Sequence, residues 1–187
     1  MSIRPIGIGH VGLMASDLEG IVAFYERVLG FQISDRMSFP DDAPWSEGVW
    51  MRCNANHHVL SIFGLREPYD GPSCARAARP GLHHLGFEVA SFDDLQRAAR
   101  FVREHGIPIQ GMRTGGPGVQ LRLYFWDPED NIVELYWAMD KVGWDGLVRP
   151  YPPVTSVDLE SFDVEAWLRV KGAEFEPPRR PQPLAGV

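Results

Sequence analysis

The chain has 187 residues and a mass of 21.0 kDa, enough for one large domain or two small modules. Hydrophobic residues make up 44% and charged residues 23%, which excludes a disordered or fibrous protein. No apolar stretch approaches the roughly 18 residues of a membrane span. A membrane is therefore not an expected partner, and neither is nucleic acid, because the formal charge of −7 repels phosphate backbones.

The two cysteines, Cys53 and Cys74, form no Cys-x-x-Cys pair. The first residues lack the apolar run of a secretory signal. We therefore expect reduced thiols and a cytoplasmic protein.

An internal repeat organises the chain. Residues 9–13 read Gly-His-Val-Gly-Leu, and residues 83–87 read His-His-Leu-Gly-Phe, so that His10 aligns with His84. Each motif predicts a strand, and each is followed by a helix and then by short strands.

The helix of the first half begins at a predicted Ser-x-x-Glu capping box formed by Ser16 and Glu19. Apolar residues recur at helical spacing from Leu18 to Leu29, and Gly30 ends the helix. Strands are then expected at residues 31–39, 47–53 and 58–65.

The helix of the second half begins after Ser91, carries an apolar stripe from Leu95 to Val102, and ends at Gly106. Strands are then expected at residues 109–114, 119–126 and 132–137. Beyond the repeat, a helix is expected at residues 158–170 and a frayed tail at 177–187.

The predicted fold is therefore α+β, with two βαβββ modules and mixed sheets. A sheet with a single helix has one uncovered face, and two such sheets can cover each other and enclose a cavity. The expected divisions are a first module at 1–65, a linker at 66–79, a second module at 80–138 and a C-terminal extension at 139–187.

Three residues predict a metal site in that cavity. His10 and His84 occupy equivalent places in the two first strands, and Glu134 is a lone carboxylate in an apolar strand. A buried carboxylate is costly unless it is paired or bound to a metal. Two imidazoles and one carboxylate are the usual ligands of non-heme Fe(II) that activates oxygen. The alternatives are hydrogen-bonded histidines without a metal and a Glu134 exposed at a sheet edge.

Aromatic residues accompany these motifs, and they either wall an apolar pocket for a ring or simply form the core between two sheets. They are Trp45, Trp50, Phe63, Trp126 and Tyr136.

The sequence resembles the vicinal oxygen chelate superfamily, which includes glyoxalase I, bleomycin-resistance proteins, epimerases and type I extradiol dioxygenases. The resemblance covers residues 6–138 and looks strongest to the extradiol ring-cleaving enzymes. It rests on the two histidine motifs, on Phe-Tyr at 24–25 with Val-Leu-Gly-Phe at 28–31, and on Tyr-Phe-Trp-Asp-Pro at 124–128 leading to Glu134.

The resemblance implies an Fe(II)-dependent dioxygenase of the catechol 2,3-type, with Mn(II) or another divalent metal as the alternative cofactor. Its substrates would be a small aromatic diol and O2. His57 resembles the family histidine that acts as acid or base beside the iron, and Tyr124 resembles the tyrosine that hydrogen-bonds a substrate oxygen. His58 and Gln120 are expected to contact the substrate. A homodimer or higher homo-oligomer is the default expectation.

Two differences from the family patterns bear on the function. The first argues against glyoxalase I, and the second argues against an extradiol enzyme. Glyoxalase I carries a fourth metal ligand, a glutamate, in the last strand of its first module, but residues 58–63 here read His-Val-Leu-Ser-Ile-Phe. This difference disfavours the glyoxalase reaction, and the predicted metal triad disfavours a bleomycin-resistance protein. The extradiol enzymes have a histidine where this chain has Gln120, which cannot shuttle a proton. That change favours another metal-dependent isomerase or lyase of the superfamily, or a protein that binds an aromatic ligand without chemistry.

Overall fold

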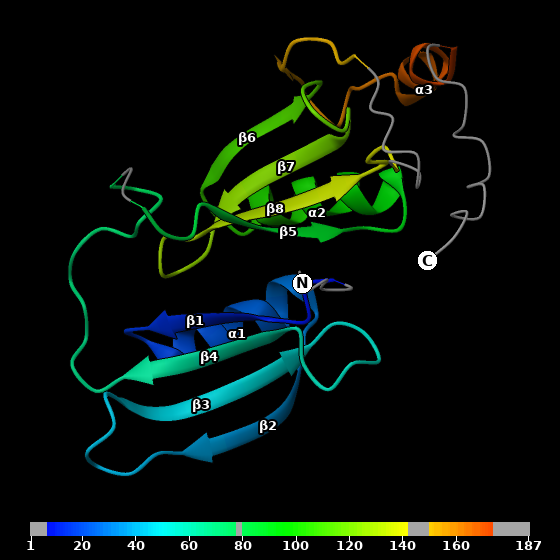
Figure 1. Cartoon of the computed structure of the whole chain (residues 1–187). Helices are drawn as coiled ribbons and strands as arrows, with labels where there is room; N and C mark the ends of the chain where they lie inside the picture. Colours follow the sequence, from blue (N-terminus) through cyan, green and yellow to red (C-terminus); the bar gives the residue numbers. More distant parts are fainter. Residues whose placement is uncertain (1–6, 78–79, 142–149, 174–187) are drawn as a thin grey trace, which may run out of the picture. The chain divides into compact units, whose positions relative to one another are not determined.

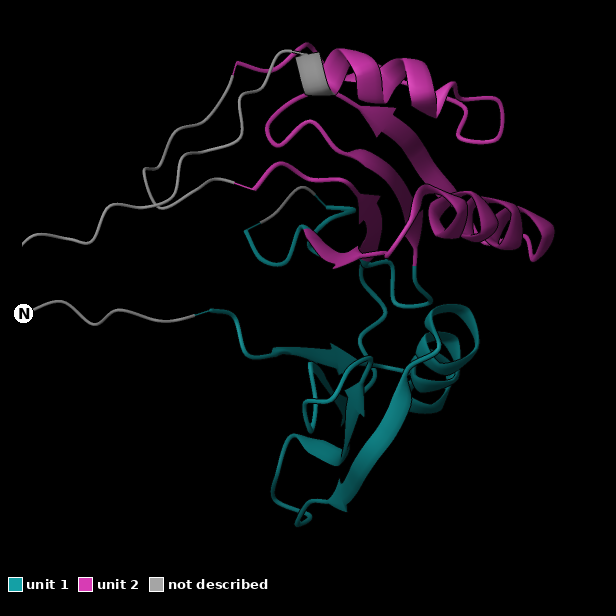
Figure 2. Cartoon of the chain, turned by 90° about the vertical axis from the view of Figure 1, so that its right-hand side faces the viewer, with its two compact units in different colours: residues 1–83, 127–131 teal, residues 84–126, 132–187 magenta. Residues whose placement is uncertain are grey.

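The computed structural model describes residues 7–77, 80–141 and 150–173 (Figure 1). The tail expected at 177–187 lies outside the described residues. The chain forms two compact units, one of Met1–His83 with Asp127–Asn131 and one of His84–Trp126 with Ile132–Val187 (Figure 2).

The first unit contains a four-stranded mixed sheet with one helix, α1 (Leu18–Leu29), on one face (Figure 1). The strands are β1 (Val11–Ala15), β2 (Gln32–Ser38), β3 (Trp45–Arg52) and β4 (Leu60–Leu65), in the order β1-β4-β3-β2. β1 runs parallel to β4, and the other pairs are antiparallel. Alternate side chains of the sheet point to α1 and are buried there, as are the apolar residues of the helix. They include Leu13, Ala15, Ile21, Val22, Val49 and Ile62.

The predicted capping box of α1 is wrong. Asp17, not Ser16, caps the helix, because its Oδ1 accepts a hydrogen bond from the Gly20 backbone N–H at 2.9 Å. The Ser16 hydroxyl instead donates to the Tyr69 carbonyl at 3.0 Å. An aspartate placed one residue closer supplies a charged acceptor at the positive end of the helix dipole and displaces the serine from this role. The predicted end at Gly30 is confirmed, since its φ of 68° is left-handed.

The second unit repeats the pattern with one strand more. The strands are β5 (His84–Glu88), β6 (Ile109–Thr114), β7 (Leu121–Trp126), β8 (Ile132–Trp137) and β9 (Thr155–Ser156), in the order β5-β8-β7-β6-β9. α2 (Phe92–Glu104) covers one face (Figure 1), and Ser91 caps it as predicted, accepting from the Asp94 N–H at 3.1 Å. The predicted α+β fold with two βαβββ modules is confirmed.

The C-terminal extension adds to the second unit in a way that the sequence pattern did not predict. β9 pairs antiparallel with β6, joining Thr155 to Thr114. The expected helix begins later than predicted, as α3 (Val164–Ala173), because the Asp163 carboxylate accepts the Ala166 N–H at 2.8 Å and caps it there. No helix in the described ranges has the length and apolar character needed to cross a membrane.

The turn Asp127–Asn131 connects β7 to β8 and packs within the first unit. Asp127 is only 4% exposed and accepts the backbone N–H groups of Glu129 and Asn131 at 3.0 and 2.8 Å. Asp130 has a φ of 59°, which confirms that an aspartate takes the left-handed position of this turn. The fully buried Tyr25 of α1 donates its hydroxyl to Asp127 Oδ2 at 3.2 Å.

We expect Tyr25→Phe to lower the free energy of unfolding by about 2 kcal/mol, because it removes a donor from a buried carboxylate. Urea unfolding measures this loss. Tyr69→Phe is the matched control, since Tyr69 is 52% exposed, and it should change stability by less than about 0.5 kcal/mol. Equal effects of the two substitutions would contradict an anchoring role for the Tyr25 hydroxyl.

Candidate metal and substrate site

The functional candidates of the second unit lie on the sheet face opposite α2. Glu134 in β8 is in register with Gly86 of β5 on one side and with Tyr124 of β7 on the other. Residues in register point to the same face, and so do residues two apart along a strand. His84, two residues before Gly86, therefore shares the face of Glu134.

Glu134 and His84 are in direct contact. His84 Nε2 lies 3.1 Å from Glu134 Oε2, and Glu134 is only 4% exposed. Glu134 Oε1 is buried, and no group in the described part of the chain meets the geometry of a hydrogen bond to it, although the Tyr124 hydroxyl lies close enough to interact with the carboxylate. A Cβ at Gly86 would lie 3.5 Å from Glu134 Oε2, so the glycine leaves space beside the carboxylate. A buried carboxylate oxygen without a hydrogen bond is rare, and this oxygen would suit a bound cation.

Tyr124 and Gln120 accompany this pair. The Tyr124 ring meets the His84 ring edge-on, with centroids 5.9 Å apart. Burial, and secondarily the Glu134 carboxylate, raise the pKa of Tyr124 to about 12, so its hydroxyl remains a hydrogen-bond donor at neutral pH. Gln120, directly before β7, is 6% exposed, and its Oε1 is buried without a partner among the described residues.

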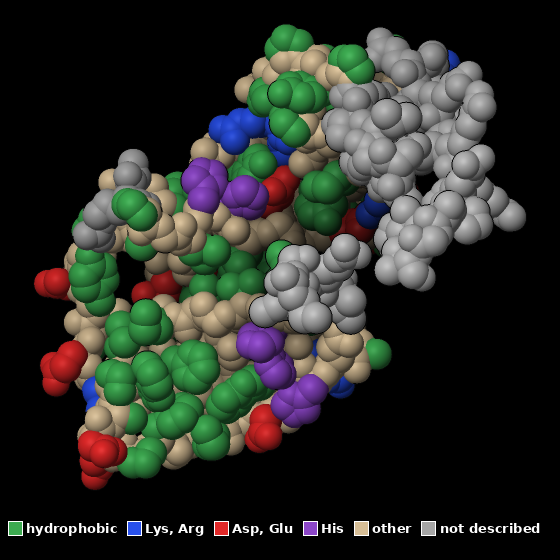
Figure 3. Space-filling model, in the orientation of Figure 1, with side chains coloured by type: hydrophobic (Ala, Val, Ile, Leu, Met, Phe, Trp, Pro, Cys, Tyr) green, Lys and Arg blue, Asp and Glu red, His purple; other side chains and the backbone are tan. Residues whose placement is uncertain are grey.

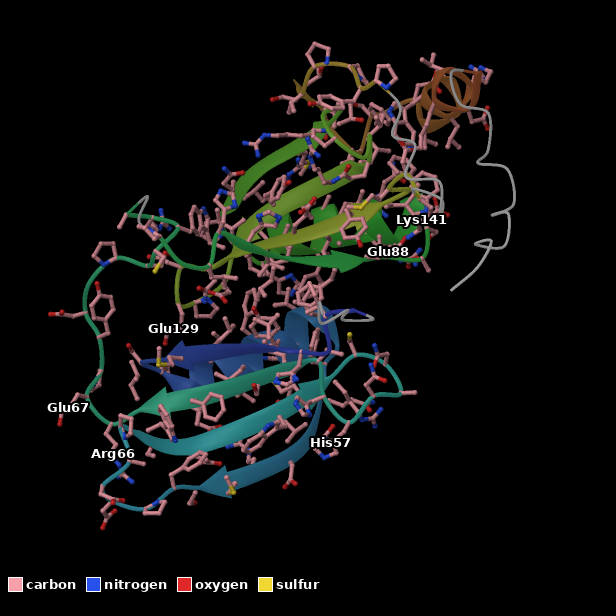
Figure 4. All side chains as sticks on the ribbon, viewed as in Figure 1. His57, Arg66, Glu67, Glu88, Glu129 and Lys141 are labelled. Carbon is pink, nitrogen blue, oxygen red and sulfur yellow. The ribbon has the colours of Figure 1, made fainter. Side chains whose placement is uncertain are left out.

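Three histidines of the first unit lie together at one end of its sheet (Figure 3). His10 directly precedes β1, and its ring centroid lies 4.6 Å from that of His58. His57 lies in the loop between β3 and β4 (Figure 4), and its Nδ1 is 3.1 Å from His58 Nδ1. Desolvation, followed by the charges of His10 and His57, lowers the pKa of His58.

The expected site residues thus fall into two groups, one in each compact unit. Two of the three expected ligands, His84 and Glu134, touch each other in the second unit, and His10 belongs to the first unit. Within the described part of either unit, no three His, Cys, Asp or Glu side chains form a group that could hold a metal by itself. A complete triad therefore stays a prediction.

The first unit has a serine where the second has Glu134. Gly12 is in register with Ser61, as Gly86 is with Glu134. Ser61 is 4% exposed and donates its hydroxyl to the Val11 carbonyl at 3.4 Å. Ser61 therefore occupies the position that corresponds to the fourth ligand of glyoxalase I. At this position the first unit has no carboxylate to accompany His10.

Aromatic side chains gather on the face of the first sheet opposite α1 (Figure 3). The Phe63 ring lies 5.6 Å from that of Trp45 and 5.9 Å from that of Trp50. A Cβ at Gly48 would lie 2.9 Å from the Trp50 ring, so a glycine is needed beneath it. These rings pack against one another at angles of 52° and 83°, as aromatic clusters commonly do, so both readings of these residues stay open.

Sequence reasoning missed two residues of the second unit's site face, Gly86 and Arg122. Both follow from alternation, since Gly86 stands two residues after His84 and Arg122 two before Tyr124. Neither glycine nor arginine is a metal ligand, so a pattern of ligand residues does not indicate them.

Two βαβββ units with mixed sheets define the class of the protein, which has the vicinal oxygen chelate fold. Residues 7–135 match the profile of the Glyoxalase/Bleomycin resistance protein/Dioxygenase superfamily, and the chain belongs to this superfamily.

Relatives range from an uncharacterized protein to an extradiol enzyme. The chain is 29% identical over 129 residues to the uncharacterized protein YwkD of Bacillus subtilis, covering 69% of this chain and 94% of YwkD. It is 35% identical over 105 residues to an iron-dependent extradiol dioxygenase of Rhodococcus jostii, covering 50% of this chain and 31% of that enzyme. This chain therefore matches only about a third of that dioxygenase.

Among solved structures, a glyoxylase/bleomycin resistance protein/dioxygenase domain from Frankia sp. superposes with a TM-score of 0.60 at 20% identity. It covers 72% of this chain and 93% of that domain. At this level of identity the likeness shows the fold alone.

Proposed function

We propose that this protein is an Fe(II)-dependent extradiol dioxygenase that cleaves the aromatic ring of a catechol-type substrate with O2. The observation that carries the proposal is the buried Glu134 carboxylate, with one oxygen against His84 and the other without a hydrogen bond from any described residue. His10 would complete a 2-His-1-carboxylate set, and Ser61 at the place of a fourth ligand favours three protein ligands over four. The named activity of the Rhodococcus relative supports the same reaction.

When bound, a divalent iron supplies the chemistry that side chains lack, because it acidifies the hydroxyls that chelate it and activates O2. His57 would take a proton from the substrate diol and return it during ring opening, since an imidazole can both accept and donate a proton. Tyr124 would donate a hydrogen bond to a substrate oxygen, for which its raised pKa keeps it protonated. Overall, one carbon–carbon bond beside the diol breaks and both oxygen atoms of O2 enter the product.

A metal-dependent isomerase or lyase is the second candidate, and Gln120 favours it. Its amide hydrogen-bonds but carries no titratable proton, and its Oε1 is buried without a partner in the described unit. An isomerase would act on a chelating substrate without consuming O2, so oxygen uptake separates the two candidates.

We expect the protein, loaded with Fe(II) under anaerobic conditions and mixed with catechols before exposure to air, to consume one O2 per diol and form a yellow ring-fission product. Oxygen electrode traces and visible absorbance record both. His10→Ala should abolish the uptake, whereas Arg100→Met, an exposed change on α2, should not. Full iron occupancy without oxygen uptake on a panel of substituted catechols would rule out the dioxygenase.

A further inference from the structure

Two arginines lie side by side on the site face of the second sheet. Arg113 of β6 is in register with Arg122 of β7, and Arg122 is two residues from Tyr124 on the same strand. All three side chains share the face of Glu134. Basic, acidic and histidine side chains can be seen together over this part of the second unit (Figure 3).

Arg122 is a buried cation that forms no ion pair with any residue in the described ranges. It is 7% exposed, its Nη2 donates to the Gly115 carbonyl at 2.9 Å, and its Nε is buried without a hydrogen-bond partner in the described structure. A carbonyl oxygen satisfies one donor but does not neutralise the charge. Burying an uncompensated guanidinium is costly, and proteins tolerate it where a ligand completes the pair.

Arg113 does not relieve this charge but adds to it. Its Nη1 donates to the neutral Gln110 side chain at 2.9 Å, and its Cζ lies 5.3 Å from the centre of the Tyr124 ring. Like charges directly opposite each other in an antiparallel pair destabilise a sheet. The described residues of the unit form no ion pair with either arginine, since Glu134 is engaged with His84 and Glu88 with Lys141 (Figure 4).

Together these side chains form a candidate binding site for an oxyanion. The guanidinium presents its N–H groups in a plane that matches the two oxygens of a carboxylate. Gln120, two residues before Arg122, is buried on the same face and has an amide that can donate as well. The whole chain carries a formal charge of −7 and repels anions, so the attraction at this site comes from Arg113 and Arg122.

We propose that the substrate of this site carries a carboxylate, which Arg122 and Arg113 bind. Resting on the proposed function, this makes the substrate a dihydroxybenzoate-like acid and not an uncharged catechol. Arg122 supplies the buried contact and Arg113 the outer one, while the diol is directed toward His84 and Glu134.

The test is direct binding to the metal-free protein, measured by calorimetry, of a dihydroxybenzoate and of its methyl ester, which has the same ring and no charge. The acid should bind at least about tenfold more tightly than the ester. In Arg122→Met the two should bind within about twofold of each other, Arg122→Lys should recover part of the preference, and Arg100→Met on α2 should retain all of it. Equal binding of acid and ester by the wild type, or no detectable binding of the acid, overturns the proposal.

Arg113→Met is a second test that does not depend on the folding of Arg122→Met. Because Arg113 is only half-buried, its substitution should disturb the fold less. If Arg122→Met does not fold, loss of the acid preference in Arg113→Met supports the proposal and its full retention overturns it. Inorganic phosphate that binds more tightly than the acid overturns the assignment of a carboxylate. An acid preference without oxygen uptake supports the carboxylate site and rules out the dioxygenase. Oxygen uptake with uncharged catechols and no acid preference supports the dioxygenase and rules out the carboxylate site.

Discussion

Glu134→Gln should weaken Fe(II) binding by roughly 100-fold or more, since it removes the charged oxygen of a ligand whose supporting contacts alone are worth tenfold or more in comparable sites. The same change should leave the metal-free protein as stable as the wild type, or more stable by about 1 kcal/mol. The reason is that Glu134 is 4% exposed and its Oε1 receives no hydrogen bond in the described structure, so the carboxylate is costly without a cation. The amide keeps the size of the side chain and a contact with His84.

These opposite effects separate a ligand from a structural carboxylate. Anaerobic equilibrium dialysis with Fe(II) measures the first, and urea unfolding in a chelator measures the second. Glu88→Gln is the matched control, because Glu88 lies on the same face two residues from Gly86 and pairs with Lys141 at 3.2 Å in a largely exposed contact. It should change iron affinity by less than about twofold. An unchanged Fe(II) affinity in Glu134→Gln, or a metal-free variant that is several kcal/mol less stable, would remove Glu134 from the site.

The repeat and the alternation of apolar residues were enough to predict both sheets and both of their helices. These signals are periodic, and each sheet buries one face against its own helix. The local sequence pattern and the tertiary packing therefore agree. The left-handed Asp130 was also predictable, because the turn motif and the tolerance of aspartate are properties of single residues.

The first capping residue and the last strand were not predictable for physical reasons. Ser16 and Asp17 are adjacent acceptors, and which one caps α1 depends on the hydrogen bonds that Ser16 makes with Tyr69, far along the chain. The two-residue strand Thr155–Ser156 has no periodicity of its own and exists because the β6 edge offers it partners.

The sequence indicated the expected metal ligands of the candidate site but not its buried arginine. His84 and Glu134 were predicted as a pair because their residue types are metal ligands, and the structure places them 3.1 Å apart, while metal binding itself stays a prediction. Arg122 was missed because arginines are common on surfaces, and only its burial and its orphaned Nε single it out. Such information comes from coordinates and not from residue type.

The extension beyond the repeat contacts the loop before β7 through a partly buried ion pair. Lys171 of α3 donates to Asp140 Oδ1 at 2.5 Å and to the Val119 carbonyl at 2.8 Å, and the two charged side chains are 15% and 13% exposed. The Asp140 N–H donates in turn to the Gly118 carbonyl at 2.9 Å. Val119 has a φ of 41°, an unfavourable value for a β-branched residue, so the loop depends on contacts that hold it.

Lys171→Met should therefore lower the free energy of unfolding by about 2 kcal/mol, because it removes a charged hydrogen-bond donor from the partly buried Asp140 carboxylate. Amide exchange at Val119 should also become faster, since the substitution frees its carbonyl and with it the segment that positions Gln120. Lys141→Met is the matched control: its ion pair with Glu88 joins side chains that are 75% and 47% exposed, and its loss should cost less than about 1 kcal/mol. Urea unfolding and hydrogen exchange of the three proteins measure both effects. Equal stability of the two variants would show that the extension does not hold the loop, and Gln120 would then be positioned by β7 alone.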